Sequence, residues 1–185
     1  MDHSPLITKT LKHSKTVAIA AETIAKETKI LDPKKAYICG YMHDIGKLFL
    51  QSNTSYKHPT LGYELLKDKY PEYAAICLCH PFPTPNLYDY FLHYCNNNKE
   101  EADKISAYIK KIEINDYILL IQLCDKISGI DEYMSIEDKF NWYESQYTIN
   151  KDLARQNYIR LKEIKQKFDD MAKIDIYTKF HLKKK

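Results

Sequence analysis

The stretch Gly40–Phe49, GYMHDIGKLF, sets a histidine beside an aspartate at the end of an apolar run. The whole chain holds only four glycines, and one of them, Gly46, follows this pair together with Lys47. A carboxylate that enters a protein core costs several kcal/mol unless a partner compensates its charge. His43 and Asp44 must therefore satisfy each other, or a group from outside the chain must satisfy both.

The apolar residues around this stretch recur at helical spacing. A helix is predicted over residues 6–29, and His13 lies on its apolar stripe, one turn before Val17. Asp32 and Pro33 suit the N-cap and first turn of a second helix, which is expected to run to about Gly46. No segment alternates in the manner of a strand between hairpin turns. The predicted fold class is therefore all-α, a compact bundle of several helices.

Further helices are predicted along the rest of the chain, over residues 59–69, 71–79 and 116–130, with an amphipathic helix after the polar run 96–98. Ser135 and Asp138 form an approximate capping box at the start of the next helix. Asn150 is expected to cap a last helix, whose apolar seam would serve core packing or a dimer contact. These C-terminal helices should span about 136–177, followed by a solvated basic tail over 179–185. Together the elements predict one domain, 1–185.

Composition narrows the function classes. The 185 residues carry a formal net charge of only +3, so no strong field recruits nucleic acid across the surface. No apolar run approaches the length that spans a bilayer, and the predicted location is the cytoplasm. The five cysteines fall mostly within apolar helical patterns, which predicts reduced core thiols. Cys77 and Cys79 are a weak alternative metal pair, because no second pair accompanies them.

Four positions stand out because each lies on, or at the end of, an apolar helical stripe: His13, His43, Asp44 and Asp125. No arginine or lysine lies on these stripes to pair with the two aspartates. Two imidazoles and two carboxylates instead make a set of N and O ligands for one or two divalent ions, with Mn, Fe, Co, Ni, Zn or Mg as candidates. The structural alternative is that the histidines are core residues and the aspartates are helix caps.

These residues resemble the HD superfamily of metal-dependent phosphohydrolases, in which a histidine, a His-Asp pair and a distant aspartate lie on successive helices. Here they are His13 in LKHSKTVA, His43 and Asp44 in YMHDIGK, and Asp125 in QLCDKISG, so the resemblance covers about 11–129. It implies a bacterial-type HD-domain protein that hydrolyses a small phosphate ester, with a nucleotide as the favoured substrate, through metal-activated water.

In two-metal members of that superfamily, two more histidines lie between the pair and the last aspartate. His58 and His80 occupy those places in chain order. The resemblance then implies that Asp44 bridges two metals, with His13, His43 and Asp125 on one and His58 and His80 on the other. If neither added histidine binds metal, the site is mononuclear, and the two contact phosphate or transfer protons.

Lys47 is expected to contact a substrate phosphate as a point charge, a role that the resemblance supports, and Asp44 and Lys47 are the predicted catalytic residues. Lys126 and Asp131 follow the last aspartate and could line the mouth of the site, with Lys126 as a substrate contact. The alternative is that Lys47, Lys126 and Asp131 are ordinary solvated surface charges.

No Gly-Tyr-Pro follows the His-Asp pair, which disfavours the cyclic-di-GMP phosphodiesterase subgroup of the HD superfamily. The stretch after His80 is PFPTPN, which differs from the hydroxyl-rich turn of the bacterial diadenosine-tetraphosphate hydrolases of that superfamily. The segment 81–113 is an insertion with five aromatic residues that could stack on a nucleobase or pack as core or lid: Phe82, Tyr88, Tyr90, Phe91 and Tyr94. The competing function is a non-catalytic or regulatory HD module that binds a nucleotide or a protein. The expected partner is a phosphorylated small molecule, and a homodimer is a further possibility.

Overall fold

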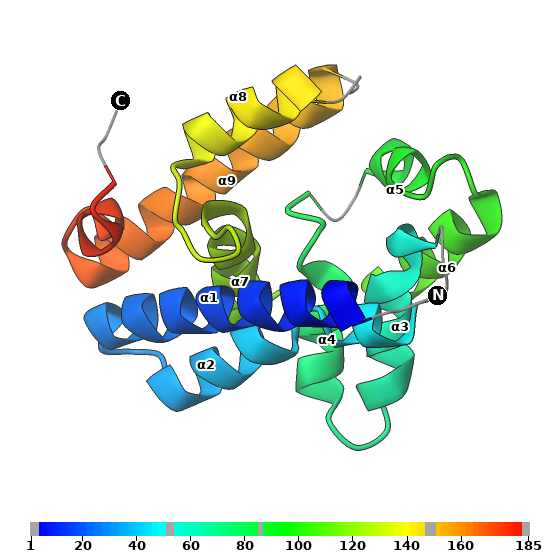
Figure 1. The fold of residues 1–185 in the computed structure, drawn as a ribbon, viewed down its shortest axis with the longest axis horizontal. Coiled ribbons are helices and arrows are strands. Elements are labelled where there is room, and N and C mark those ends of the chain that lie inside the picture. Colours follow the sequence, from blue (N-terminus) through cyan, green and yellow to red (C-terminus); the bar gives the residue numbers. More distant parts are fainter. Residues whose placement is uncertain (1–3, 51–53, 85–86, 147–150, 183–185) are drawn as a thin grey trace.

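The computed structural model describes residues 4–50, 54–84, 87–146 and 151–182. Figure 1 shows α1 lying along α2, with α8 and α9 side by side at the opposite face and α5 and α6 at one end. The α-helices of these residues are α1 (Ser4–Thr28), α2 (Pro33–Met42), α3 (His58–Leu66), α4 (Pro71–Cys79), α5 (Tyr88–Tyr94), α6 (Lys99–Ile109), α7 (Asp116–Ile127), α8 (Ile136–Gln146) and α9 (Lys151–Ala172). Short 3-10 helices are η1 (Ile45–Phe49), η2 (Ser55–Lys57) and η3 (Ile176–Phe180). The described ranges contain no strand, and the all-α prediction is confirmed.

The first two helices follow the sequence closely. Asp32 caps α2, because its carboxylate accepts from the backbone N–H of Lys34 at 2.8 Å, and Pro33 fills the first turn. The predicted end of α2 was wrong, however. The helix ends at Met42 instead of near Gly46, because the backbone leaves helical geometry at Asp44 (φ −104°, ψ 13°) and tightens into η1. His43 is thus the last residue to follow α2, and Asp44 lies in the bend.

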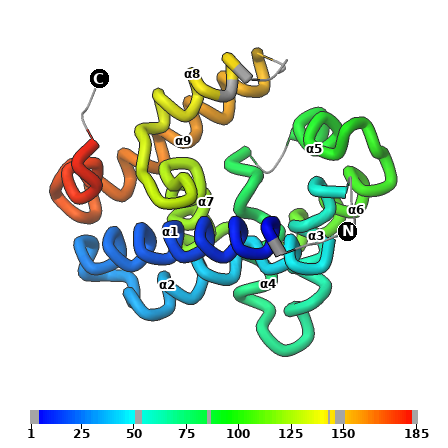
Figure 2. Tube along the Cα trace, in the orientation of Figure 1, coloured from blue at the N-terminus to red at the C-terminus, as the bar shows by residue number. Residues whose placement is uncertain are grey.

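Helix α7 runs through the middle of the core. It packs against α1, α2, α4 and α9, and the tube trace in Figure 2 shows it behind α1. Leu120, Ile121 and Leu123 are fully buried on it, as the apolar run predicts. Asn115 caps its first turn by accepting from the N–H of Ile118 at 3.1 Å. Because most of α7 is buried, an inward polar group in its last turn needs a specific partner.

Gly46 lets η1 lie directly against α3. A Cβ built on Gly46 would lie 2.0 Å from the backbone oxygen of His58 and 2.8 Å from the nitrogen of Gly62. A Cβ on Gly62 would in turn meet Cys77 at 2.8 Å. Two glycines therefore permit three backbone segments to approach more closely than any side chain allows. This contact brings the bend after α2 up to the first residue of α3.

The C-terminal helices α8 and α9 pack against the rest of the bundle, where α9 contacts α1 and α7 and α8 contacts α7. Ser135 and Asp138 form the predicted cap of α8, since the Ser135 Oγ accepts from the N–H of Asp138 at 3.0 Å. Leu161, Ile164 and Phe168 of α9 are buried against the main core, so the apolar seam serves packing. Asn150 lies outside the described residues.

The prediction of a solvated tail was wrong at its start. Lys179 and Phe180 belong to η3, and Phe180 is buried against the ring of Tyr133 with centroids 4.7 Å apart. Lys179 pairs with Glu27 of α1 at 2.8 Å. Phe180 therefore anchors the start of the basic run in the core.

The insertion packs mainly as core. Phe82 is fully buried and makes edge contacts with Tyr90, Phe91 and Tyr94, with centroid distances of 4.9 to 5.8 Å. Phe91 is buried as well. All five cysteines are buried and free, as predicted for reduced core thiols. Across the described residues, no helix combines the length and apolar character needed to cross a membrane.

Candidate metal centre

All six predicted ligands come together from five helices. His13 comes from α1, His43 and Asp44 follow the end of α2, His58 begins α3, His80 follows α4, and Asp125 lies in the last turn of α7. Asp44 is the centre of the group and is 1% exposed. The contact between His13 and Asp125 joins residues 112 positions apart in the chain.

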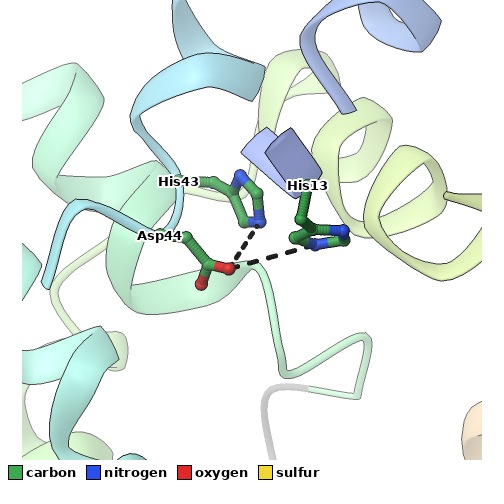
Figure 3. A group of neighbouring side chains, drawn as sticks. All are labelled: His13, His43 and Asp44. Atoms are coloured by element: carbon green, nitrogen blue, oxygen red, sulfur yellow. Dashed lines mark ion pairs between the residues drawn. The ribbon is translucent and has the colours of Figure 1, made fainter. Parts of the chain in front are cut away.

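One oxygen of Asp44 faces the rings of His13 and His43, and these three residues form the first triad. Figure 3 shows His13 and His43 turned toward the same carboxylate oxygen. Asp44 Oδ2 lies 3.3 Å from His43 Nε2 and 3.9 Å from His13 Nε2. Asp125 closes the group, because its Oδ1 lies 3.0 Å from His13 Nε2 and 3.7 Å from His43 Nε2. Two imidazole nitrogens and two carboxylate oxygens thus face one another.

The other oxygen of Asp44 faces the rings of His58 and His80, and these three residues form the second triad. Asp44 Oδ1 lies 3.2 Å from His58 Nε2 and 3.4 Å from His80 Nε2. The two imidazole nitrogens are themselves 3.2 Å apart. The donor atoms of each triad all lie within 4.8 Å of one another, which is close enough for each triad to hold a metal ion. Asp44 is the one member common to both.

Backbone carbonyls fix the orientation of all four rings. The Nδ1 atoms of His13, His43, His58 and His80 lie 2.6 to 2.9 Å from the carbonyl oxygens of Gly129, Gly40, Ser55 and Cys77, respectively. A carbonyl oxygen only accepts hydrogen bonds, so each Nδ1 must carry the hydrogen. In the neutral ring the lone pair then sits on Nε2, which points into the site. Metal-binding histidines are commonly held in this way.

Protons alone do not satisfy this arrangement. Burial lowers the pKa of His58 to about 3, and burial also lowers the pKa of His80. Both rings are therefore neutral, and their Nε2 lone pairs face each other and Asp44 Oδ1 with no hydrogen between them. Asp44 Oδ1 and His43 Nε2 are both buried without a hydrogen-bond partner among the described residues. Three converging acceptors at these distances need a cation, so the residues fit a divalent metal.

Charged neighbours shift the pKa values of the groups around the first triad. Burial opposes the ionised form of Asp44, but His43 and Lys47 outweigh it and hold the pKa of Asp44 well below its usual range. Burial is likewise outweighed at Asp125, where Lys126 and His13 keep the pKa low. The two carboxylates together raise the pKa of His43 to about 9 against the effect of its burial. In the metal-free chain His43 therefore holds a proton that a metal has to displace.

The sequence argument that both aspartates lack a cationic partner was wrong. Lys47 Nζ lies 2.6 Å from Asp44 Oδ2, and Lys126 Nζ lies 2.6 Å from Asp125 Oδ2. Lys47 lies in η1 and Lys126 in the last turn of α7, and their side chains are 31% and 20% exposed. Neither lysine donates to Asp44 Oδ1, which keeps no hydrogen-bond partner among the described residues.

Asp131, which was expected to be able to line the mouth of the site, is exposed and pairs with Lys12 at 3.5 Å. Cys77 of the weak alternative metal pair donates to the backbone oxygen of Met42 at 3.2 Å, and no cysteine belongs to a metal-type group within the described ranges. The sequence analysis also missed a close neighbour, since the Tyr94 hydroxyl lies 3.4 Å from His58 Nδ1. Tyr94 was one of the five aromatic residues of the insertion, but spacing could not single it out.

The fold and the site together define an all-α protein with a buried histidine–aspartate centre suited to divalent metal. The family model for the HD domain matches residues 10–130, more than half of the chain, and the protein belongs to this family. Members of the family are generally metal-dependent hydrolases. All six converging residues lie within the matched range, whereas α8, α9 and η3 lie beyond it. No curated protein and no solved structure matches the chain.

Proposed function

We propose that this protein is a metal-dependent phosphohydrolase that acts on a small phosphate ester, with a nucleotide as the favoured substrate. The observation that carries the proposal is the position of Asp44, whose two oxygens each face a separate pair of imidazole nitrogens. A site for two divalent ions that share one carboxylate accounts for this arrangement. His13, His43 and Asp125 would hold one ion, and His58 and His80 the other.

When bound, such ions lower the pKa of coordinated water and offset the charge that develops on phosphoryl oxygens. The chain itself supplies the rigidity that this chemistry requires. Each imidazole is held by a carbonyl, and Asp44 is fixed between four rings. Because the ring positions are set before substrate arrives, little reorganisation is needed on binding.

Lys47 is the proposed substrate contact closest to Asp44. Its ammonium group lies 2.6 Å from Asp44 Oδ2 while its side chain reaches solvent. Lys126 holds the matching position beside Asp125. Both lysines can donate to phosphate oxygens at the mouth of the site, and there they neutralise negative charge. The whole chain is proposed to act as one domain, since α9 packs on both α1 and α7 of the matched region.

The test is phosphate release from a panel of nucleotides and simple phosphate esters, with added Mn²⁺ or Mg²⁺ and with chelator. The wild type should release product only with metal, and Asp44→Asn should release none while its helical circular dichroism stays unchanged. Saturable nucleotide binding without product would instead favour the non-catalytic HD module. Full activity of Asp44→Asn would defeat the proposal.

A further inference from the structure

His58 has a side-chain hydrogen-bond contact at Nδ1 that the other three rings of the site lack among the described residues. Each Nδ1 lies against one backbone carbonyl, which for His58 is that of Ser55 at 2.6 Å. The Tyr94 hydroxyl lies 3.4 Å from the same nitrogen. Because Nδ1 carries one hydrogen and donates it to Ser55, the hydroxyl oxygen is a second acceptor for that hydrogen. Acceptors at the outer nitrogen fix the direction of the ring and make Nε2 a better metal ligand.

The carbonyl that orients His58 comes from a shorter element than those of its neighbours. The oxygens that orient His43 and His80 belong to helices α2 and α4. Ser55 instead begins η2, a 3-10 helix of three residues. A 3-10 helix of this length has few backbone hydrogen bonds of its own. The position of η2 therefore depends on contacts with other segments.

Helix α6 of the insertion supplies such contacts on both sides of His58. Asn98 caps α6 by accepting from the N–H of Glu101 at 3.1 Å, and its Nδ2 donates to the Tyr56 hydroxyl at 3.2 Å. The Thr60 hydroxyl donates to the carboxylate of Glu101, and both residues are buried. Figure 1 shows α6 beside α3. Tyr56 and Thr60 lie two residues before and after His58, so α6 holds the chain around this ligand.

Tyr94 is itself fixed by the aromatic core of the insertion. Its ring makes an edge contact with Phe82, with centroids 4.9 Å apart, and lies 6.4 Å from the ring of His58. Phe82 is fully buried and follows His80 by two residues. The ring packing that builds the core of the insertion therefore also places the Tyr94 hydroxyl at His58.

We propose that the insertion positions the second triad, and that Tyr94 is the positioning residue through which it acts on His58. This inference rests on the proposed function, because it concerns one of the two ions of that site. Tyr94 holds the His58 ring with its Nε2 lone pair directed at Asp44 Oδ1, from which Nε2 lies 3.2 Å. The affinity for the ion at the second triad would then depend on the Tyr94 hydroxyl. The rings of the first triad are oriented by α2 and by the turn after α7, so its ion should not depend on Tyr94.

The test is calorimetric titration of the metal-free protein with Mn²⁺. The wild type should bind two ions, and His58→Ala identifies the ion that the first triad holds. Tyr94→Phe removes only the hydroxyl and keeps the ring packing. It should weaken the second ion by about 10- to 100-fold, as is usual when a ligand loses an outer partner, and leave the first ion unchanged. In a His58→Ala background, Tyr94→Phe should have no further effect, because Tyr94 acts through that ring.

Tyr108→Phe is the matched control within the insertion. The Tyr108 hydroxyl also donates to a side chain of α3, but to Glu64, more than one turn after His58. Its loss should leave both ions bound as in the wild type. The inference is overturned if Tyr94→Phe binds both ions as tightly as the wild type, if it weakens both by the same factor, or if Tyr108→Phe weakens the second ion as much. Two ions in the wild type would still support the proposed function in those cases, whereas a wild type that binds no metal would overturn both.

Discussion

Replacing Gly46 with alanine should damage both the fold and one half of the candidate metal centre. The added methyl would lie 2.0 Å from the backbone oxygen of His58, so the two segments must separate by about 1 Å before the contact reaches 3.0 Å, below which Cβ contacts are essentially absent. Neither partner is a flexible side chain. Overpacking of this kind typically costs about 1–3 kcal/mol, and a backbone clash belongs at the upper end. For a chain of this length, that is a fall in the melting temperature of roughly 6–12 °C.

The same displacement separates Asp44 from His58 and His80, because η1 carries the bend that holds Asp44. Thermal unfolding followed by circular dichroism, with metal content measured on the same samples, tests both effects. Gly129→Ala is the control, since its nearest contact is the flexible Cγ of Glu132 at 2.9 Å. The reasoning is refuted if Gly46→Ala is as stable as Gly129→Ala and retains the metal content of the wild type.

Three further predictions address the separate parts of the site and its support. His58→Ala should lose about half of the bound metal and keep the rest, because the first triad does not use this ring; complete loss or no loss in elemental analysis would contradict the two-triad arrangement. Metal affinity at the first triad should rise as pH rises toward about 9 and then level off, because the pKa of His43 is raised to about 9 and its proton must leave before Nε2 can bind a cation. The slope should be at most about tenfold per pH unit, for one proton, and a flat calorimetric profile below that pH would be inconsistent with it. Phe82→Ala should cost about 3–5 kcal/mol in urea unfolding, because the ring is fully buried among aromatic neighbours; a cost below about 1 kcal/mol would mean that the insertion packs loosely.

The sequence predicted most of the helices because their signals are local. Asp32 and Pro33 predict the start of α2, and Ser135 and Asp138 predict the start of α8. Apolar spacing placed His13 on the inner face of α1 and Asp125 on that of α7. These features depend on neighbours within one or two helical turns, which the order of residues displays directly.

Contacts between distant segments could not be predicted in the same way. The carbonyl of Gly129 that orients His13 lies 116 residues away in the chain. The approach of Gly46 to His58 depends on how η1 meets α3.

Metal content of the purified protein and of Asp44→Asn tests the central claim most directly. An asparagine amide can donate to the Nε2 atoms of His58 and His80, which lie within 3.4 Å of Asp44 Oδ1, so this variant should fold without metal. The wild type, reconstituted with Mn²⁺ or Zn²⁺ and freed of excess ion, should hold about two equivalents, as the two triads allow. Asp44→Asn should lose both. A wild type that retains no metal after reconstitution, or a variant that retains as much as the wild type, would contradict a metal centre built on Asp44.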